Sequence, residues 1–269
     1  MSEFYLILLF LSVGFSAGIL IGMMGIGGGV IFIPSLYFLL PYTGIDQSHL
    51  PYYAISISLF AGAIAASFSS VLHLLLGNVD KGRALLFALG SALAAFISVF
   101  FVTSVSPMIL KSIFAGVLFI IAVVMFRDSH LKKDLKRNEP INDYALPLVG
   151  LFVGILSAFT GLGGGIIFFP VLHYLFLLKP KTAIGTSSVI TAITMIFASI
   201  SFFINRIDWM GEYQSSNTYF AVAIPLGIGA VVGARMGVSF VIHLESLMIK
   251  KIFSILLIIV VIKIIFGLW

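Results

Sequence analysis

The chain has 269 residues, of which 61% are hydrophobic and only 9% are charged, and its formal net charge is +5. A soluble domain usually carries about 25% charged residues, so this composition excludes a soluble fold and predicts an all-α polytopic membrane protein. The excess of Lys and Arg then reports cytoplasmic loops and indicates no nucleic-acid partner, while the lack of cysteine excludes disulfides and thiolate metal sites.

Apolar runs follow one another along the whole chain and fall into two sets of five. The first set covers residues 4–24, 30–40, 51–76, 84–105 and 107–126. The second set covers residues 144–160, a short run that ends at 178, and residues 182–204, 219–240 and 247–268. We therefore expect a first transmembrane repeat (1–126), a charged cytoplasmic linker (127–143) and a second transmembrane repeat (144–269).

A glycine-rich motif stands at the same place in each set. The sequence Gly-Ile-Gly-Gly-Gly-Val-Ile-Phe-Ile-Pro at 25–34 recurs 136 positions later as Gly-Leu-Gly-Gly-Gly-Ile-Ile-Phe-Phe-Pro at 161–170. Each glycine costs a helix about 1 kcal/mol relative to alanine, so a triplet inside an apolar run predicts a break in a helix. Two matching breaks at a fixed offset indicate two homologous repeats with glycine-broken helices.

The orientation of the repeats depends on whether the short runs cross the bilayer. If they cross, each repeat has five crossings and the repeats are inverted; if they are re-entrant, each has four and the repeats are parallel. Five crossings put twelve Lys and Arg residues inside against three outside, whereas four crossings give nine against six. Since Lys and Arg are enriched on the cytoplasmic side, we predict inverted repeats with both termini outside.

The triple glycines are also the candidate substrate site. Each triplet ends one helix and begins another, so N–H groups at the new helix start lack intrahelical partners and lie at the positive end of the dipole. Such a start can bind an anion without a charged side chain, although close helix packing is the alternative use of the glycines. The candidate residues are Gly27, Gly28, Gly29, Gly163, Gly164 and Gly165.

Hydroxyl side chains follow each motif at corresponding places. They are Ser56 and Ser58 in the first repeat, and Thr186, Ser187 and Ser188 in the second. These groups would donate hydrogen bonds to the oxygens of an anion, or would join helices to one another.

His73 is one of the few ionisable side chains inside a predicted span, so it is the candidate for proton coupling, with a purely structural role as the alternative.

Signatures of catalysis are missing from the sequence. We find no P-loop, no His-x-x-x-His pair, no carboxylate cluster and no nucleophile elbow. We therefore expect neither an enzyme nor ATP hydrolysis, and no metal or cofactor.

Three patterns in the sequence are similar to those of a known family. The doubled Gly-x-Gly-Gly-Gly-x-Ile-Phe-x-Pro motif, Ala-Ile-Gly-Thr-Ser at 183–187 and Gly-Asn-Val-Asp at 77–80 resemble the TauE/SafE family of sulfite and organosulfur-anion exporters. The resemblance covers essentially the whole chain. The first repeat departs from the pattern, with Ser-Ile-Ser at 56–58 where the second has Gly-Thr-Ser at 185–187. The resemblance implies a multi-pass transporter in the cytoplasmic membrane of a prokaryote.

We therefore expect a secondary, non-ATP transporter that moves a small anion by alternating access. The resemblance implies sulfite or another sulfur-containing anion, such as a sulfonate or thio-acid, and a singly charged anion costs less to desolvate than a dianion. The alternatives are an anion channel with the same glycine-lined pore and a non-transporting membrane subunit. The expected partners are the small-molecule anion and the lipid bilayer, while the sequence leaves an oligomer, the coupling ion and the direction of transport open.

Overall fold

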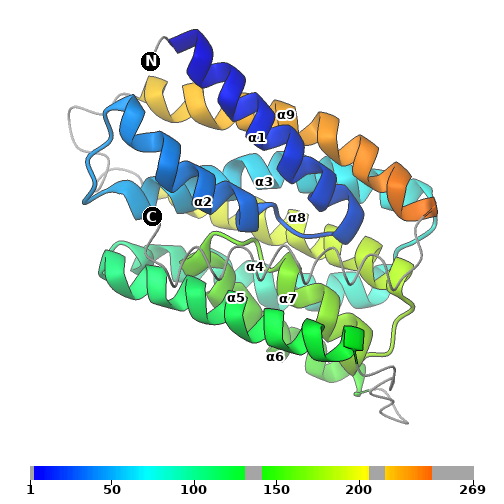
Figure 1. Cartoon of the computed structure of the whole chain (residues 1–269). Helices are drawn as coiled ribbons and strands as arrows, with labels where there is room; N and C mark the ends of the chain where they lie inside the picture. Colours follow the sequence, from blue (N-terminus) through cyan, green and yellow to red (C-terminus); the bar gives the residue numbers. More distant parts are fainter. Residues whose placement is uncertain (1–2, 131–140, 206–215, 244–269) are drawn as a thin grey trace.

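The computed structural model describes residues 3–130, 141–205 and 216–243, and over these ranges the chain is helical (Figure 1). Seven of its helices are long and apolar enough to cross a membrane, which confirms an all-α polytopic membrane protein. The seven are α1 (Glu3–Met24), α3 (Leu50–Leu75), α4 (Lys81–Val102), α5 (Pro107–His130), α6 (Leu146–Thr160) together with the 3-10 turn Asp143–Ala145 that precedes it, α8 (Pro180–Ile204) and α9 (Ser216–His243).

Two short helices follow the glycine motifs, as the sequence predicts. They are α2 (Gly29–Leu39), continued by a 3-10 turn at Leu40–Thr43, and α7 (Gly165–Pro170), continued by a π-helical turn at Val171–Leu175. At about 1.5 Å per residue, the 11 residues of α2 cover about half of the hydrocarbon core. Each half of the molecule therefore holds one helix that starts partway along its neighbours.

The predicted boundaries between repeats fall partly outside the described residues. Helix α5 continues to His130, past the expected start of the linker at 127, and residues 131–140 are not described. The predicted loop at 205–217 lies largely outside the described ranges, and the predicted last span, 247–268, lies wholly outside them.

Local sequence explains where several helices begin and end. Asp80 caps α4, because its side chain accepts a hydrogen bond from the backbone N–H of Arg83 at 3.1 Å. Proline stands in the first turn of α3, α6 and α8, where its missing N–H costs no hydrogen bond. Helix α6 ends at Gly161, whose φ of 68° lies in the left-handed region that terminates helices.

The first helix of each half packs against the other half. Helix α1 lies along α9, and α6 lies along α4 (Figure 1). Gly14 of α1 lies against the Leu226 carbonyl of α9, and Gly150 of α6 lies in the same way against the Phe87 carbonyl of α4. Small residues permit this close approach of membrane helices, which agrees with a packing role for these earlier glycines.

Helices α3 and α8 occupy the centre and run antiparallel. A side chain at Gly62 of α3 would meet Met195 of α8, whereas Ser69, two turns further along α3, receives a hydrogen bond from Ser188 at 3.0 Å. Moving forward along α3 therefore moves the contact backward along α8. Equivalent helices that meet antiparallel are related by an axis perpendicular to their length, so this contact supports the prediction of inverted repeats, which a topology experiment must test.

Candidate functional site

The two glycine motifs meet each other at the centre of the molecule. We call residues 25–29 together with residues 161–165 the glycine crossing. A Cβ atom on Gly29 would lie 2.5 Å from the Gly161 carbonyl oxygen, and one on Gly165 would lie 2.5 Å from the Gly25 carbonyl oxygen. The same contact is thus made twice, with the roles of the two halves exchanged. Only glycine permits this backbone-to-backbone approach.

Helices α2 and α7 both begin inside the crossing. Their caps are Gly28 and Gly164, whose φ angles of 74° and 73° lie in the left-handed region. The Gly28 carbonyl oxygen accepts the backbone N–H groups of Ile31 and Phe32, and the Gly164 carbonyl oxygen accepts those of Ile167 and Phe168. The amide groups of Gly28, Gly29, Gly164 and Gly165 are buried and have no acceptor among the described residues.

Two of the predicted hydroxyl groups lie at the crossing, and both donate to its carbonyl oxygens. Ser58 donates to Gly161 at 2.8 Å, and Ser187 donates to Gly25 at 3.0 Å and to Gly165 at 3.2 Å. Thr191, which the sequence did not single out, also donates to Gly25, at 3.3 Å. The crossing is therefore held together by hydroxyl–carbonyl hydrogen bonds between the two halves.

The other predicted hydroxyl groups bond away from the crossing. Ser56 donates to the Tyr53 carbonyl within its own helix, and the Thr186 hydroxyl accepts the backbone N–H of Asp80. Ser188 donates to Ser69. Helix–helix and capping bonds account for these three side chains in this conformation.

His73 is fully buried near the end of α3, away from the crossing. Its Nε2 atom lies 3.1 Å from the carbonyl oxygen of Gly22 on α1, so Nε2 carries the proton and donates. Its Nδ1 atom has no hydrogen-bond partner among the described residues. The ring thus joins α3 to α1 and keeps one nitrogen able to accept a proton.

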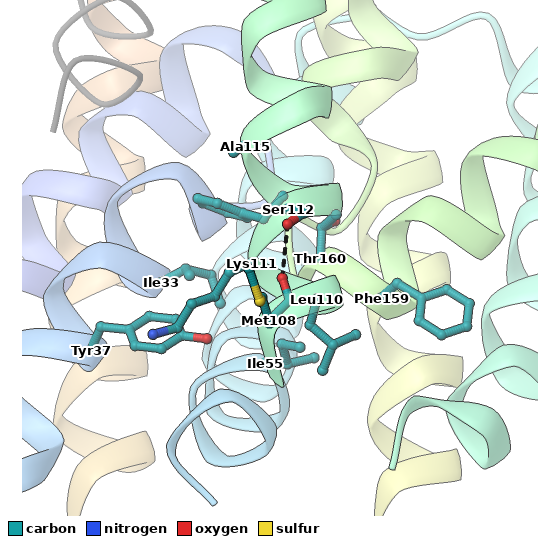
Figure 2. Close-up of a pocket in the computed structure, with 11 residues that line it drawn as sticks. Ile33, Tyr37, Ile55, Met108, Leu110, Lys111, Ser112, Ala115, Phe159 and Thr160 are labelled. Atoms are coloured by element: carbon teal, nitrogen blue, oxygen red, sulfur yellow. Dashed lines mark hydrogen bonds between the residues drawn. The ribbon is translucent and has the colours of Figure 1, made fainter. Parts of the chain in front are cut away.

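A cavity of about 220 Å³ lies beside the crossing, between α2, α3, α5 and α6 (Figure 2). Its most polar lining group is Lys111, whose Nζ atom lies 4.9 Å from the centre of the Tyr37 ring. We call it the Lys111 cavity; its lining residues are Ile33, Tyr37, Ile55, Met108, Leu110, Lys111, Ser112, Phe114, Ala115, Phe159 and Thr160.

The Lys111 cavity and the glycine crossing share a wall. Ile33 and Ile55 line the cavity, and both also contact Gly161: a Cβ atom there would lie 2.9 Å from Ile33 Cδ1 and 3.1 Å from Ile55 Cα. Thr160, the residue before Gly161, lines the cavity as well. These residues therefore lie both at the cavity and against the backbone of the second glycine motif.

Sequence reasoning did not single out Lys111, although a signal for it is present. The sequence Met-Ile-Leu-Lys-Ser-Ile-Phe at 108–114 recurs as Leu-Met-Ile-Lys-Lys-Ile-Phe at 247–253. This offset of 139 also relates Phe87 to Leu226, which make equivalent contacts. The counterpart Lys250 lies outside the described residues, so only its position in the sequence is used.

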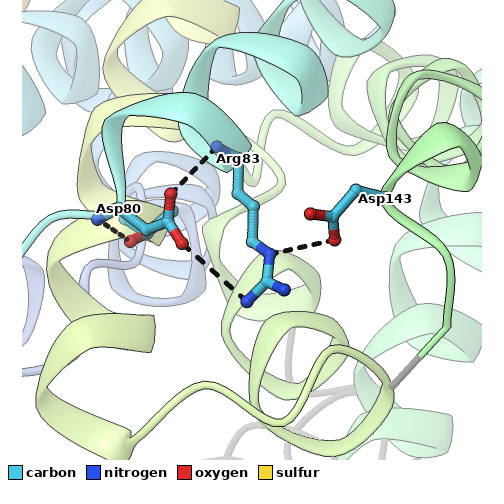
Figure 3. A network of polar contacts seen from close by, with 4 residues as sticks. Asp80, Arg83 and Asp143 are labelled. Carbon is cyan, nitrogen blue, oxygen red and sulfur yellow. Dashed lines mark hydrogen bonds and ion pairs between the residues drawn. The ribbon is translucent and has the colours of Figure 1, made fainter. Parts of the chain in front are cut away.

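An ionic network joins the two halves near the opposite end of α5. Arg83 Nε donates to Asp143 Oδ1 at 2.9 Å, and Arg83 also lies 3.8 Å from Asp80 Oδ2 (Figure 3). Asp80 belongs to the turn before α4, while Asp143 precedes α6. The backbone N–H of Asp80 reaches Thr186 of α8 at 3.0 Å. We call Asp80, Arg83 and Asp143 the ionic clasp.

The described residues hold no cluster of three or more His, Cys, Asp or Glu side chains that could bind a metal ion. The molecule combines long apolar helices with a pair of short helices that meet at its centre. This arrangement is typical of a membrane transport protein. The chain belongs to the sulfite exporter TauE/SafE family, whose model matches residues 10–264. The predicted family resemblance is thereby confirmed.

Curated relatives cover nearly the whole chain. A probable membrane transporter protein of Haemophilus influenzae is 29% identical over 97% of this chain and 98% of its own length. Similar proteins with the same description occur in Methanocaldococcus jannaschii (28% identical; 88% of this chain and 87% of the relative) and Bacillus subtilis (27%; 92% and 93%). No solved structure matches. Together with the helices, these findings show a multi-pass membrane transporter of the cell membrane.

Proposed function

We propose that the protein is a secondary transporter that moves a small, singly charged anion by alternating access, and that the anion passes through the glycine crossing. The observation that carries this proposal is the crossing itself. Two broken helices start there, and their buried first amides have no acceptor among the described residues. Buried N–H groups without a partner are costly, so a site that presents four of them favours a ligand with acceptor oxygens.

The electrostatics of the crossing favour a negative ligand. The N-terminal ends of two helices converge on it, and each carries a partial positive charge. The hydroxyl groups of Ser58 and Ser187 supply further donors once they leave the carbonyl oxygens of the closed crossing. Among the residues that the structure describes, the hydrogen-bonding partners at the crossing include no carboxylate.

The family name supports sulfite. No Lys, Arg or His side chain among the described residues hydrogen-bonds at the crossing, which supports the singly protonated form of sulfite. A sulfonate or thio-acid meets the same requirement, since each presents one charge and several acceptor oxygens or sulfur. A dianion would lose more hydration than partial charges restore. The crossing is closed in this structure by backbone contacts, so transport requires the two glycine motifs to separate.

The test is transport by purified protein in liposomes. Labelled sulfite, methanesulfonate and a carboxylate of similar size are offered against an imposed membrane potential. We expect saturable uptake of the sulfur anions that is slowed by a negative interior, because a charge crossing 100 mV meets about 2.3 kcal/mol. Exchange of labelled for unlabelled substrate across the membrane identifies a carrier. Flux without saturation or exchange identifies a channel, and no flux of any anion overturns the proposal.

We further propose His73 as the proton-coupling residue, should transport respond to a pH gradient. Its burial and its unpartnered Nδ1 atom support this role. Glutamine can keep the hydrogen bond to Gly22 but cannot exchange a proton near neutral pH. We expect His73→Gln to transport without the pH-gradient response, and a variant that keeps the full response removes His73 from coupling.

A further inference from the structure

We propose that the Lys111 cavity is a binding site at one end of the anion's route, and that it takes an organic anion with one charged end and a small apolar body. This inference rests on the proposed function, because it adds a second binding site to the same route. The cavity is separate from the glycine crossing but shares the wall of Ile33 and Ile55 with it.

Lys111 carries a charge that the described residues leave unneutralised. It lies one turn into α5, within the apolar span Pro107–Val124. No carboxylate among the described residues forms an ion pair with it, and its ammonium group lies over the face of the Tyr37 ring. An aromatic face attracts a cation without accepting its N–H groups in hydrogen bonds to oxygen, so Lys111 keeps donors for an anion.

The hydroxyl groups of Ser112 and Thr160, which also line the cavity, are already engaged. The Ser112 hydroxyl donates to the Met108 carbonyl at 2.9 Å, and the Thr160 hydroxyl donates to Leu156 at 2.6 Å while accepting from the Leu162 N–H. Recognition of a charge in this cavity therefore depends mainly on Lys111. A charged residue inside a membrane span that faces a cavity is the usual mark of a substrate route.

The side chains that line the cavity indicate the chemistry of the uncharged part of the ligand. Apart from Lys111, Ser112, Thr160 and the Tyr37 hydroxyl, the cavity is lined by apolar side chains, with Met108, Phe114 and Phe159 among them. Its volume of about 220 Å³ is several times the roughly 30 Å³ that a water molecule occupies in the liquid. A bare oxyanion would leave most of this apolar surface against water, whereas a small organic anion covers it.

The chain offers a direct test because it contains no cysteine. Ser112→Cys places one thiol in the cavity, and Ser104→Cys places one on the exposed turn before α5, outside the cavity. Each is reacted with anionic 2-sulfonatoethyl and cationic 2-(trimethylammonium)ethyl methanethiosulfonate. The anionic reagent is itself a small organic sulfonate. The ratio of the two rates cancels any effect of Lys111 on the ionisation of the thiol.

We expect the anionic-to-cationic rate ratio to be higher at Ser112→Cys than at Ser104→Cys. Adding Lys111→Gln should lower it at Ser112→Cys by about tenfold, because one unit charge near the thiol is removed. The same substitution should leave the ratio at Ser104→Cys nearly unchanged. An unchanged ratio at Ser112→Cys, or an equal fall at both thiols, overturns the proposal. This measurement requires no transport, so it stands even if the proposed function fails.

Transport kinetics supply the second arm in liposomes that move an anion. Lys111→Gln should raise the KM for an organic sulfonate about tenfold, whereas Lys81→Gln, which removes an exposed lysine of α4, should leave it unchanged. Lys111→Arg keeps the charge and should restore most of the affinity. The apolar part is tested by comparing methanesulfonate with propanesulfonate, of which the longer should bind more tightly. A normal KM in Lys111→Gln, with transport intact, overturns the cavity as a binding site and leaves the proposed function standing.

Discussion

The glycine crossing and the Lys111 cavity share a wall but are built in opposite ways. The crossing is symmetric: Gly29 meets Gly161 as Gly165 meets Gly25, and its hydroxyl groups are bound to carbonyl oxygens. The cavity is one-sided and open, and its charge has no described counter-ion. One region is packed backbone against backbone, and the other keeps space beside a cation.

The comparison shows that the most conspicuous sequence motif and the polar group most available to a ligand lie in different parts of the molecule. The glycines bring two helix starts together, so in this conformation they act as a joint between the halves and would close the proposed route. Lys111 lies in the cavity on one side of that joint. We infer that this conformation is open towards the cavity and closed at the crossing and at the ionic clasp.

The largest expected effect is an all-or-none difference in cysteine labelling, and it shows on which side of the membrane the cavity lies. Inverted repeats put Ser2 and the turn before α5 outside and Lys179 inside, whereas parallel repeats put Ser2 inside and Lys179 outside. Single cysteines at Ser2, Ser104 and Lys179 can be labelled in intact cells with an impermeant thiol reagent, against the silent cysteine-free chain. We expect labelling at the first two only. Labelling at Lys179 together with protection at Ser2 contradicts the inverted arrangement.

The next effect concerns the packing of the crossing. Gly29→Ala and Gly165→Ala each push a Cβ atom to within 2.5 Å of a backbone oxygen, which cannot rotate away as a side chain would. We expect each to lower the free energy of unfolding by about 3 kcal/mol, and by similar amounts because the contacts are reciprocal. The measurement is thermal unfolding in detergent.

The matched control for that packing test is Gly116→Ala. Gly116 lies in α5 with no atom within 4 Å of its added Cβ, so alanine should leave stability unchanged or raise it through helix propensity. If Gly29→Ala unfolds no earlier than Gly116→Ala, the crossing is looser than the structure shows. If only one of the crossing variants is destabilised, the two halves are not equivalent there.

The sequence could predict the helix breaks but not their meeting. A glycine triplet in an apolar run is a local signal, and the short helices Gly29–Leu39 and Gly165–Pro170 follow it. That the two triplets touch is a tertiary fact about segments 136 positions apart, which local propensity does not encode. Ser58 and Ser187 were predicted and lie at the crossing. Ser56 instead bonds within its own helix, and the bonds of Thr186 and Ser188 depend on partners far along the chain. Lys111 was missed because one lysine near a helix end looks like a loop charge.

A smaller effect distinguishes hydroxyl groups at the crossing from those elsewhere. Ser58→Ala and Ser187→Ala each remove bonds to buried carbonyl oxygens, and we expect a loss of about 1 kcal/mol in each, slightly more for Ser187 with its two acceptors. Ser12→Ala, whose exposed hydroxyl bonds only to its own helix, should change stability little. The melting-temperature rise on adding sulfite should also be smaller in the two crossing variants. An equal rise in all three indicates that these hydroxyl groups never contact the anion.

The smallest effect is expected at the ionic clasp, at the far end from the cavity. The Asp143 side chain is 45% exposed, and a solvated ion pair is worth about 0.2–1 kcal/mol, so Asp143→Asn should barely change the melting temperature. The same energy is large enough to change the ratio of two conformations up to about fivefold, because about 1.4 kcal/mol corresponds to tenfold. If the clasp holds its end of the molecule closed, Asp143→Asn should slow thiol labelling at Ser112→Cys by up to that factor, since the cavity-open state becomes less populated.

Asp46→Asn is the control, because Asp46 caps an exposed turn through the N–H of Ser48 and belongs to no ion pair within the described residues. High salt screens the ion pair, so in the protein with the intact clasp it should slow thiol labelling at Ser112→Cys as Asp143→Asn does. At each salt concentration, Asp46→Asn should be labelled at the same rate as the protein with the intact clasp. Equal labelling rates in both variants would show that the clasp is a solvated pair without influence on the cavity.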